Sequence, residues 1–215
     1  MAKAGPRTKE CQKRMVQEGV DGPLREYGFN RAGKRLTWIR ETSQLIHIVN
    51  VWTRWGKYYK IQWGIRAEPV TTILWGPQRD PYDVAYSAIT GNARDEGGTW
   101  EVDEKTTDEA VTTMASATAQ SMREIALWLA GFKTRQDGLA WLRQDDDDHR
   151  QATVPWSGAL RLFIATAFAA VDHDAVACTL MDELQASFAP RLRGKETRKQ
   201  MERLMEWVEP LCREA

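Results

Sequence analysis

The sequence lacks several features that would assign the protein to a familiar class. No apolar run approaches the length of a membrane-spanning helix, so we expect no association with a membrane. The first residues, MAKAGPRTKE, carry basic side chains without an apolar stretch behind them, so no secretory signal is expected. The sequence contains no P-loop, G-x-G-x-x-G, H-E-x-x-H or G-x-S-x-G motif. None of the signatures that most directly indicate an enzyme is therefore present, and we predict no cofactor.

Cysteine is scarce and its spacing indicates no metal or redox site. Cys11, Cys178 and Cys212 are far apart, odd in number and outside any C-x-x-C pattern. We therefore expect three buried free thiols in a reducing, cytoplasmic location.

The three histidines each have a structural explanation. His47 falls on the apolar face of a predicted strand, which favours a buried imidazole over a catalytic base. His173 lies in an Asp-His-Asp break between two predicted helices, where aspartate commonly caps the second helix. His149 ends the acidic run 145–149, which lacks the glycine and spaced ligands of a calcium loop and is predicted to be a solvated linker. We predict no catalytic residues and no metal site.

The charge is zero overall but uneven along the chain. Residues 1–70 hold 14 Lys and Arg against 6 Asp and Glu, whereas residues 71–150 hold 8 against 15. A basic third of this kind can attract an anionic partner. It can also face the acidic third, and the neutral total favours this second interpretation, because nucleic-acid-binding domains usually carry a clear positive charge.

Length, composition and periodicity predict an α+β fold. The 215 residues with 42% hydrophobic side chains are enough for one core with an extension. Period-two patterns rich in β-branched and aromatic residues predict an antiparallel meander of about four to five strands. The predicted strands are RLTWIRE, QLIHIVNVWTR, YYKIQWGIR, VTTILW and, after a Pro- and Gly-rich loop, WEVD.

Helices are predicted on both sides of this sheet in the sequence. A short helix ending at Gly19 and a second one ending at Gly28 precede it, and a long helix capped at Thr106 runs to Leu129 after it. A shorter helix starts near Asp137. We divide the chain into an α+β domain, residues 1–150, and a docked helical extension, residues 151–215, made of a helical hairpin and a final helix.

Parts of the sequence resemble a bacterial domain-of-unknown-function family, number forty-three-oh-four. The resemblance covers about residues 9–145 and rests on LREYGFNRAGKRLTWIRE, IHIVNVWTRWGKYYKIQWGI and IALWLAGFKTRQDGLAWL. The positions that match the family pattern are Leu24, Gly28, Phe29, Asn50, Gly64 and Ile65. The resemblance implies a compact α+β fold with no settled activity, and it supplies no catalytic residues.

The aromatic run VNVWTRWGKYYKIQWGI predicts a hairpin with two different faces. A three-residue turn at 55–57 sets Thr53 opposite Tyr59 and Val49 opposite Trp63, so one face is apolar and forms the core. The other face combines aromatic rings, cations and amides, and we predict that it is a binding surface unless other elements cover it. Its residues are Asn50, Trp52, Arg54, Tyr58, Lys60 and Gln62.

Three functional hypotheses remain open. The first is a non-enzymatic module that recognises a protein partner, because Trp, Tyr and Arg dominate interface hot spots. The kind of family that the chain resembles suggests a toxin-neutralising or defence-associated role for it. The second is a nucleic-acid or nucleotide binder that uses the basic first third and stacks bases on the basic, aromatic sheet face. The third is an enzyme with a site between the sheet and the helical tail. The oligomeric state is left open.

Overall fold

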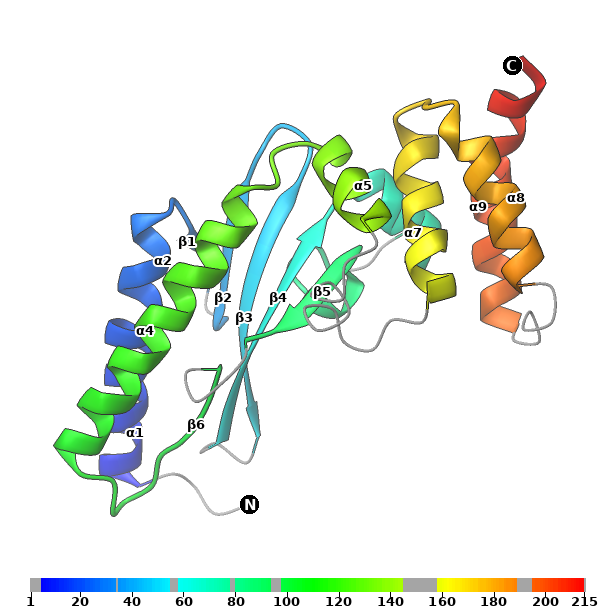
Figure 1. The fold of residues 1–215 in the computed structure, drawn as a ribbon. Coiled ribbons are helices and arrows are strands. Elements are labelled where there is room, and N and C mark those ends of the chain that lie inside the picture. Colours follow the sequence, from blue (N-terminus) through cyan, green and yellow to red (C-terminus); the bar gives the residue numbers. More distant parts are fainter. Residues whose placement is uncertain are drawn as a thin grey trace.

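The computed structural model describes residues 5–33, 35–54, 58–77, 80–93, 98–144, 158–188 and 195–214. Within them the fold is α+β, with one antiparallel sheet between helices (Figure 1). The predicted fold class is confirmed. The acidic run 145–149 and the turn at 55–57 lie outside the described residues, as does the predicted domain boundary at residue 150, which stays a prediction.

The amino-terminal segment is one helical stretch where two helices were predicted. It consists of α1 (Pro6–Arg14), the π-helical η1 (Met15–Asp21) and α2 (Gly22–Glu26), without a break. Gly19 does not end a helix as predicted but lies at the contact with a later helix, where an added Cβ would be 3.1 Å from the Cβ of Thr118. Glycine at this position therefore allows two helices to pack closely.

The described strands form a six-stranded sheet whose central pair is the predicted hairpin. β1 (Asn30–Arg31), β2 (Thr37–Glu41), β3 (Ile46–Arg54), β4 (Tyr58–Arg66) and β5 (Ile89–Asn92) follow in this order, and β6 (Thr99–Glu101) also pairs with β4. The β3–β4 register sets Thr53 opposite Tyr59 and Val49 opposite Trp63, which confirms the prediction.

One predicted strand is a helix, and one predicted loop contains a strand. The segment VTTILW belongs to α3 (Glu68–Trp75), in which Pro69 occupies the first turn. Its buried residues, Val70, Thr71, Ile73 and Leu74, follow the helical spacing, so tertiary packing outweighed the β-propensity of Val, Thr and Ile. The following loop contains the short 3-10 helix η2 (Val84–Tyr86) and strand β5.

Helices α4 (Asp108–Ala130) and α5 (Arg135–Arg143) supply aromatic partners to the apolar face of the hairpin. Trp63, a predicted core residue, is 5% exposed and packs on Trp128 with ring centroids 4.7 Å apart. Trp128 also contacts Phe132 and Trp141. The cap of α4 is Thr107, one residue later than predicted, and its hydroxyl accepts from the Ala110 N–H.

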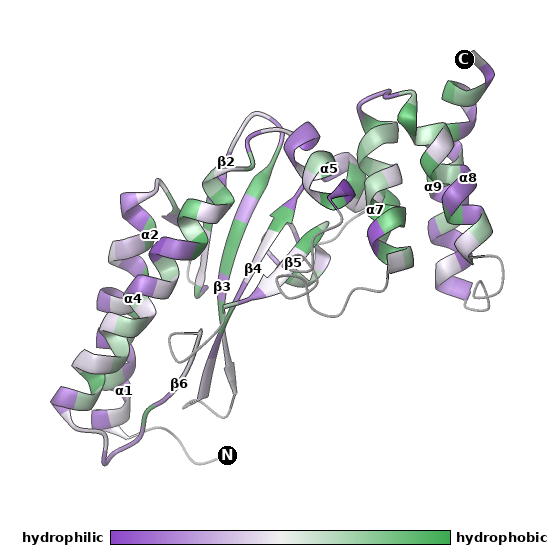
Figure 2. Cartoon of the chain, viewed as in Figure 1, coloured by the Kyte–Doolittle hydropathy of each residue, from purple (hydrophilic) through white to green (hydrophobic). Residues whose placement is uncertain are grey.

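The carboxyl-terminal helices pack on α3 and α5. Helix α7 (Gly158–Val171) lies between these elements and the pair α8 (Val176–Phe188) and α9 (Lys195–Glu214) (Figure 1). Figure 2 shows α7 as predominantly hydrophobic, in keeping with the burial of all its residues from Phe163 to Val171. Arg203 of α9 donates to the backbone carbonyls of Ile73 and Leu74. Helix α9 therefore supplies hydrogen-bond donors to carbonyl groups at the carboxyl-terminal end of α3.

Two of the three cysteines form a disulfide, which contradicts the prediction of three free thiols. Cys178 on α8 is bonded to Cys212 on α9, and their Cα atoms are 5.7 Å apart. Only Cys11 is a buried free thiol. The sequence gives no sign of this pair because only the folding of the helical tail brings α8 beside α9. The reducing, cytoplasmic location rested on free thiols and stays a prediction.

His47 is a buried neutral imidazole, as its position on the apolar face predicted. Its Nδ1 accepts hydrogen bonds from the guanidinium of Arg40 at 3.2 and 2.9 Å, which fixes the proton on Nε2. Burial, and secondly the charge of Arg40, lower the pKa of His47 from 6.5 to about 4. The Asp-His-Asp break is also a cap as predicted, since Asp174 accepts from the Val176 N–H.

The disulfide generates the first prediction. Cys212→Ser should lower the free energy of unfolding by about 2 to 4 kcal/mol, because the unfolded chain is released from a 34-residue loop. Urea denaturation with and without dithiothreitol measures this loss. The reductant should destabilise the wild-type protein to the same extent and leave the variant unchanged. A wild-type curve that does not respond to reductant would contradict the bond.

The second prediction concerns pH. Because the pKa of His47 is lower in the folded than in the unfolded state, the unfolded state binds the extra proton, and stability falls as the pH drops from 6.5 towards 4. This group should remove about 3 kcal/mol over that window. His47→Gln, which keeps a neutral acceptor for Arg40, should therefore show a shallower pH dependence in denaturation. His173→Asn is the control, since it removes an exposed imidazole, and a matching change there would refute the assignment to His47.

Candidate functional site

The second face of the hairpin is covered at one end and open at the other. At the covered end Ile48 and Arg66 are buried, and the Ser87 side chain lies directly over Gly64, where an added Cβ would be 2.3 Å from its Oγ. At the open end Trp52 is 46% exposed. The segment containing η2, not the helical tail, therefore supplies this cover.

A row of polar side chains crosses the sheet between the two ends. The register aligns Thr37 of β2, Asn50 of β3, Gln62 of β4 and Asn92 of β5. We call these four residues the amide row. Asn50 Nδ2 donates to Thr37 Oγ1 at 2.7 Å, and Gln62 Nε2 donates to Asn92 Oδ1 at 3.4 Å. A terminal amide can form up to four hydrogen bonds, so much of the capacity of the row is available to a ligand.

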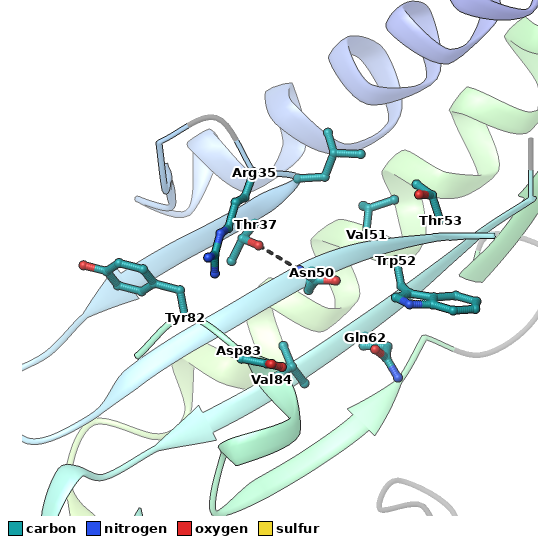
Figure 3. A pocket seen from close by; sticks show the side chains of 11 residues that line it. Arg35, Thr37, Asn50, Val51, Trp52, Thr53, Gln62, Tyr82, Asp83 and Val84 are labelled. Carbon is teal, nitrogen blue, oxygen red and sulfur yellow. Dashed lines mark hydrogen bonds between the residues drawn. The ribbon is translucent and has the colours of Figure 1, made fainter. Parts of the chain in front are cut away.

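A hollow of about 490 Å³ lies over this row, within the usual size of ligand sites. We call it the large hollow. Figure 3 shows Tyr82, Asp83 and Val84 along one side of it, with Trp52 at the opposite end. The remaining lining residues come from β2, β3, β4 and the two positions just before β2: Arg35, Leu36, Thr37, Asn50, Val51, Thr53 and Gln62.

A second hollow of about 280 Å³ adjoins the first and is called the small hollow. Gln62 and Val84 line both hollows, so the two are adjacent, and we call them together the groove. Lys60, Thr90 and Asn92 add polar side chains to the small hollow, and Gly91 and Ala85 complete its lining. The register places Lys60, Gln62, Thr90 and Asn92 on the same face of the sheet, because alternate residues of a strand share a face.

The two ends of the groove differ in charge. At the end of the large hollow near Tyr82, Arg35 forms an ion pair with Asp80, and this pair together with the Tyr82 N–H lowers the pKa of Asp80. Asp83 accepts from the Ala85 N–H and so caps η2. Among the described residues, no carboxylate lines the small hollow and none forms an ion pair with Lys60. The groove is therefore most positive at Lys60.

Four of the six predicted surface residues line the groove. They are Asn50, Trp52, Lys60 and Gln62. Tyr58 is half-buried, lies on β4 closer to the turn than Lys60, and lines neither hollow. Arg54 lies opposite Tyr58, but its side chain is outside the described part of the structure.

The sequence interpretation missed the residues contributed by other strands and by η2. Thr37, Tyr82, Thr90 and Asn92 were not predicted as surface residues, and the last two lie on a strand that was predicted as loop. The one sequence signal for Thr90 and Asn92 is the alternation in ITGN, which places both side chains on the outward face. This alternating stretch is only four residues long.

Other classes of site find no support in the described ranges. No group of three His, Cys, Asp or Glu residues there is placed to hold a metal ion. No helix among those residues has both the length and the apolar character needed to span a membrane. His47 is on the core face, and Asp172, beside His173, is paired with Arg135.

Comparison with known proteins adds no assignment. No family model, curated protein or solved structure matches this chain, so the resemblance to the domain-of-unknown-function family stays a prediction.

Proposed function

We propose that the protein is a non-enzymatic module that binds single-stranded nucleic acid in the groove on the second sheet face. The observation that carries this proposal is the exposed indole of Trp52 beside a row of side-chain amides and Lys60, which has no ion-pair partner among the residues that the structure describes. Together these groups match the three parts of a nucleotide: a flat base, its polar edge and a phosphate.

Trp52 supplies a stacking surface. Its side chain lies at the open end of the large hollow, next to Asn50 and Gln62 (Figure 3). Stacking of a base on an aromatic side chain contributes about 1 to 3 kcal/mol and tolerates any base. Since β3 is held in the centre of the sheet, the indole is presented on a rigid strand and binding would order little of the protein.

The amide row supplies groups that read base edges. Asn and Gln side chains carry a donor and an acceptor side by side, which suits the paired donor and acceptor of a base edge. Asn50 is held by its bond to Thr37 and Gln62 by its bond to Asn92, so both amides are oriented before a ligand arrives.

Part of the basic third is paired with the acidic third within the fold. Arg7 and Arg14 both pair with Asp108, and Arg35 pairs with Asp80. The prediction that the basic and acidic thirds face each other is confirmed for these residues. The proposed binding therefore relies on contacts inside the groove and should show a modest dependence on salt.

Recognition of a protein partner, the first of the sequence hypotheses, is the second candidate. Trp52 favours it, because an exposed tryptophan at the end of a groove is also typical of an interface hot spot. In that case peptides would compete for the groove and oligonucleotides would not. A toxin-neutralising or defence-associated role would belong to this candidate.

The third prediction tests the proposed function. Trp52→Ala should weaken binding of a fluorescent 12-nucleotide DNA strand by about 5- to 150-fold in a low-salt anisotropy titration. Trp207→Ala is the matched control, because Trp207 is 39% exposed on α9 and lines neither hollow. Failure of the wild-type protein to bind the strand, or equal losses in both variants, would rule out this function for the groove.

A further inference from the structure

We infer that the small hollow is the phosphate subsite of the nucleotide whose base stacks on Trp52. This inference rests on the proposed function and assigns a separate role to Lys60, Gln62, Thr90 and Asn92.

Among the residues that the structure describes, the small hollow is lined by hydrogen-bond donors and by no carboxylate. The ammonium group of Lys60, the hydroxyl of Thr90 and the amides of Gln62 and Asn92 all line it, and each of these groups can donate a hydrogen bond. Phosphate oxygens accept hydrogen bonds, and bonds that involve charged groups are the stronger ones. A lysine without an ion-pair partner in the described part of the chain is ready to take an anion.

The small hollow lies next to Trp52 on the same face of the sheet. Trp52 and Lys60 are direct partners in the β3–β4 register, and directly opposed residues have Cβ atoms about 4.5 to 5.5 Å apart. The two side chains therefore start from neighbouring positions on the same face of the sheet, where one nucleotide can contact both.

The charges at the two ends fix the direction of the ligand. Asp83 and Arg35 line the large hollow, and Arg35 is already paired with Asp80, so a phosphate there would meet one carboxylate and a cation that is not free. In the same hollow, the amino groups of a base would find acceptors. The phosphate therefore belongs at Lys60, in the hollow that Val84 and Ala85 of η2 also line.

The experiment compares adenosine, AMP and inorganic phosphate with the full-length protein by calorimetry in low salt. AMP should bind about five- to tenfold more tightly than adenosine, and added NaCl should shrink this gain. Lys60→Met should reduce the affinity for AMP to that for adenosine and leave adenosine unchanged. Lys60→Arg, which keeps the charge, should restore most of the gain. Lys199→Met, an exposed lysine on α9, is the matched control and should change neither affinity.

The outcomes separate this inference from the proposed function. Equal affinities of the wild-type protein for AMP and adenosine, both lost in Trp52→Ala, would overturn the phosphate subsite and leave the stacking surface intact. An equal loss of both ligands in Lys60→Met would also overturn it. Tight binding of inorganic phosphate that is independent of Trp52 would identify a general anion site instead.

A strand should bind at least as tightly as AMP. A salt titration of the 12-nucleotide strand should show a slope smaller by about 0.7 in Lys60→Met than in the wild-type protein, as expected for the loss of one phosphate contact. Weaker binding of the strand than of AMP would reassign the groove to a free nucleotide. Absence of binding by all these ligands would reject the proposed function together with the subsite.

Discussion

The register of the β3–β4 hairpin is the constraint on which both the core and the groove depend. Because side chains alternate between faces, the pairing of Val49 with Trp63 sends the apolar residues to one side and the amides to the other. A slip by one residue would move Trp63 towards the groove and Gln62 into the core. Burial of large apolar side chains contributes about 1.5 to 3 kcal/mol each, so this slip is strongly disfavoured.

The core also determines how rigid the groove is. Trp63 of β4 packs on Trp128 of α4, and Trp128 in turn contacts Phe132 and Trp141. These contacts hold β4 in place on the core side of the sheet. Lys60 and Gln62 alternate with buried Ile61 on the same strand. Their backbone is therefore fixed by the apolar face, and only their side chains adjust to a ligand. A site built on strands in this way loses little conformational entropy on binding.

The sequence allowed the hairpin to be predicted because long strands with strict alternation leave one register that separates polar from apolar residues. The prediction at VTTILW was wrong, because its β-branched residues are compatible with a strand or a helix. Packing around Ile73 and Leu74 favours the helix. The sequence could not reveal Thr90, Asn92 or the bond between Cys178 and Cys212, because each depends on segments that meet only in the folded chain. The groove residues on the β3–β4 hairpin could thus be predicted from the local sequence. Those on other segments could not, because their positions depend on the topology of the folded chain.

Charge pairing within the fold also limits how the groove can attract a ligand. Asp108 is shared by Arg7 and Arg14, and Asp80 holds Arg35, so several cations of the basic third contribute little field at a distance. A protein of zero net charge has little overall attraction for nucleic acid. The proposed recognition would then rely on short-range stacking and hydrogen bonding, which are the interactions that Trp52 and the amide row offer. Lys60 matters for the same reason, because it is the only cation and faces no carboxylate among the described residues that line the small hollow, so it would discriminate between ligands by where their charge lies.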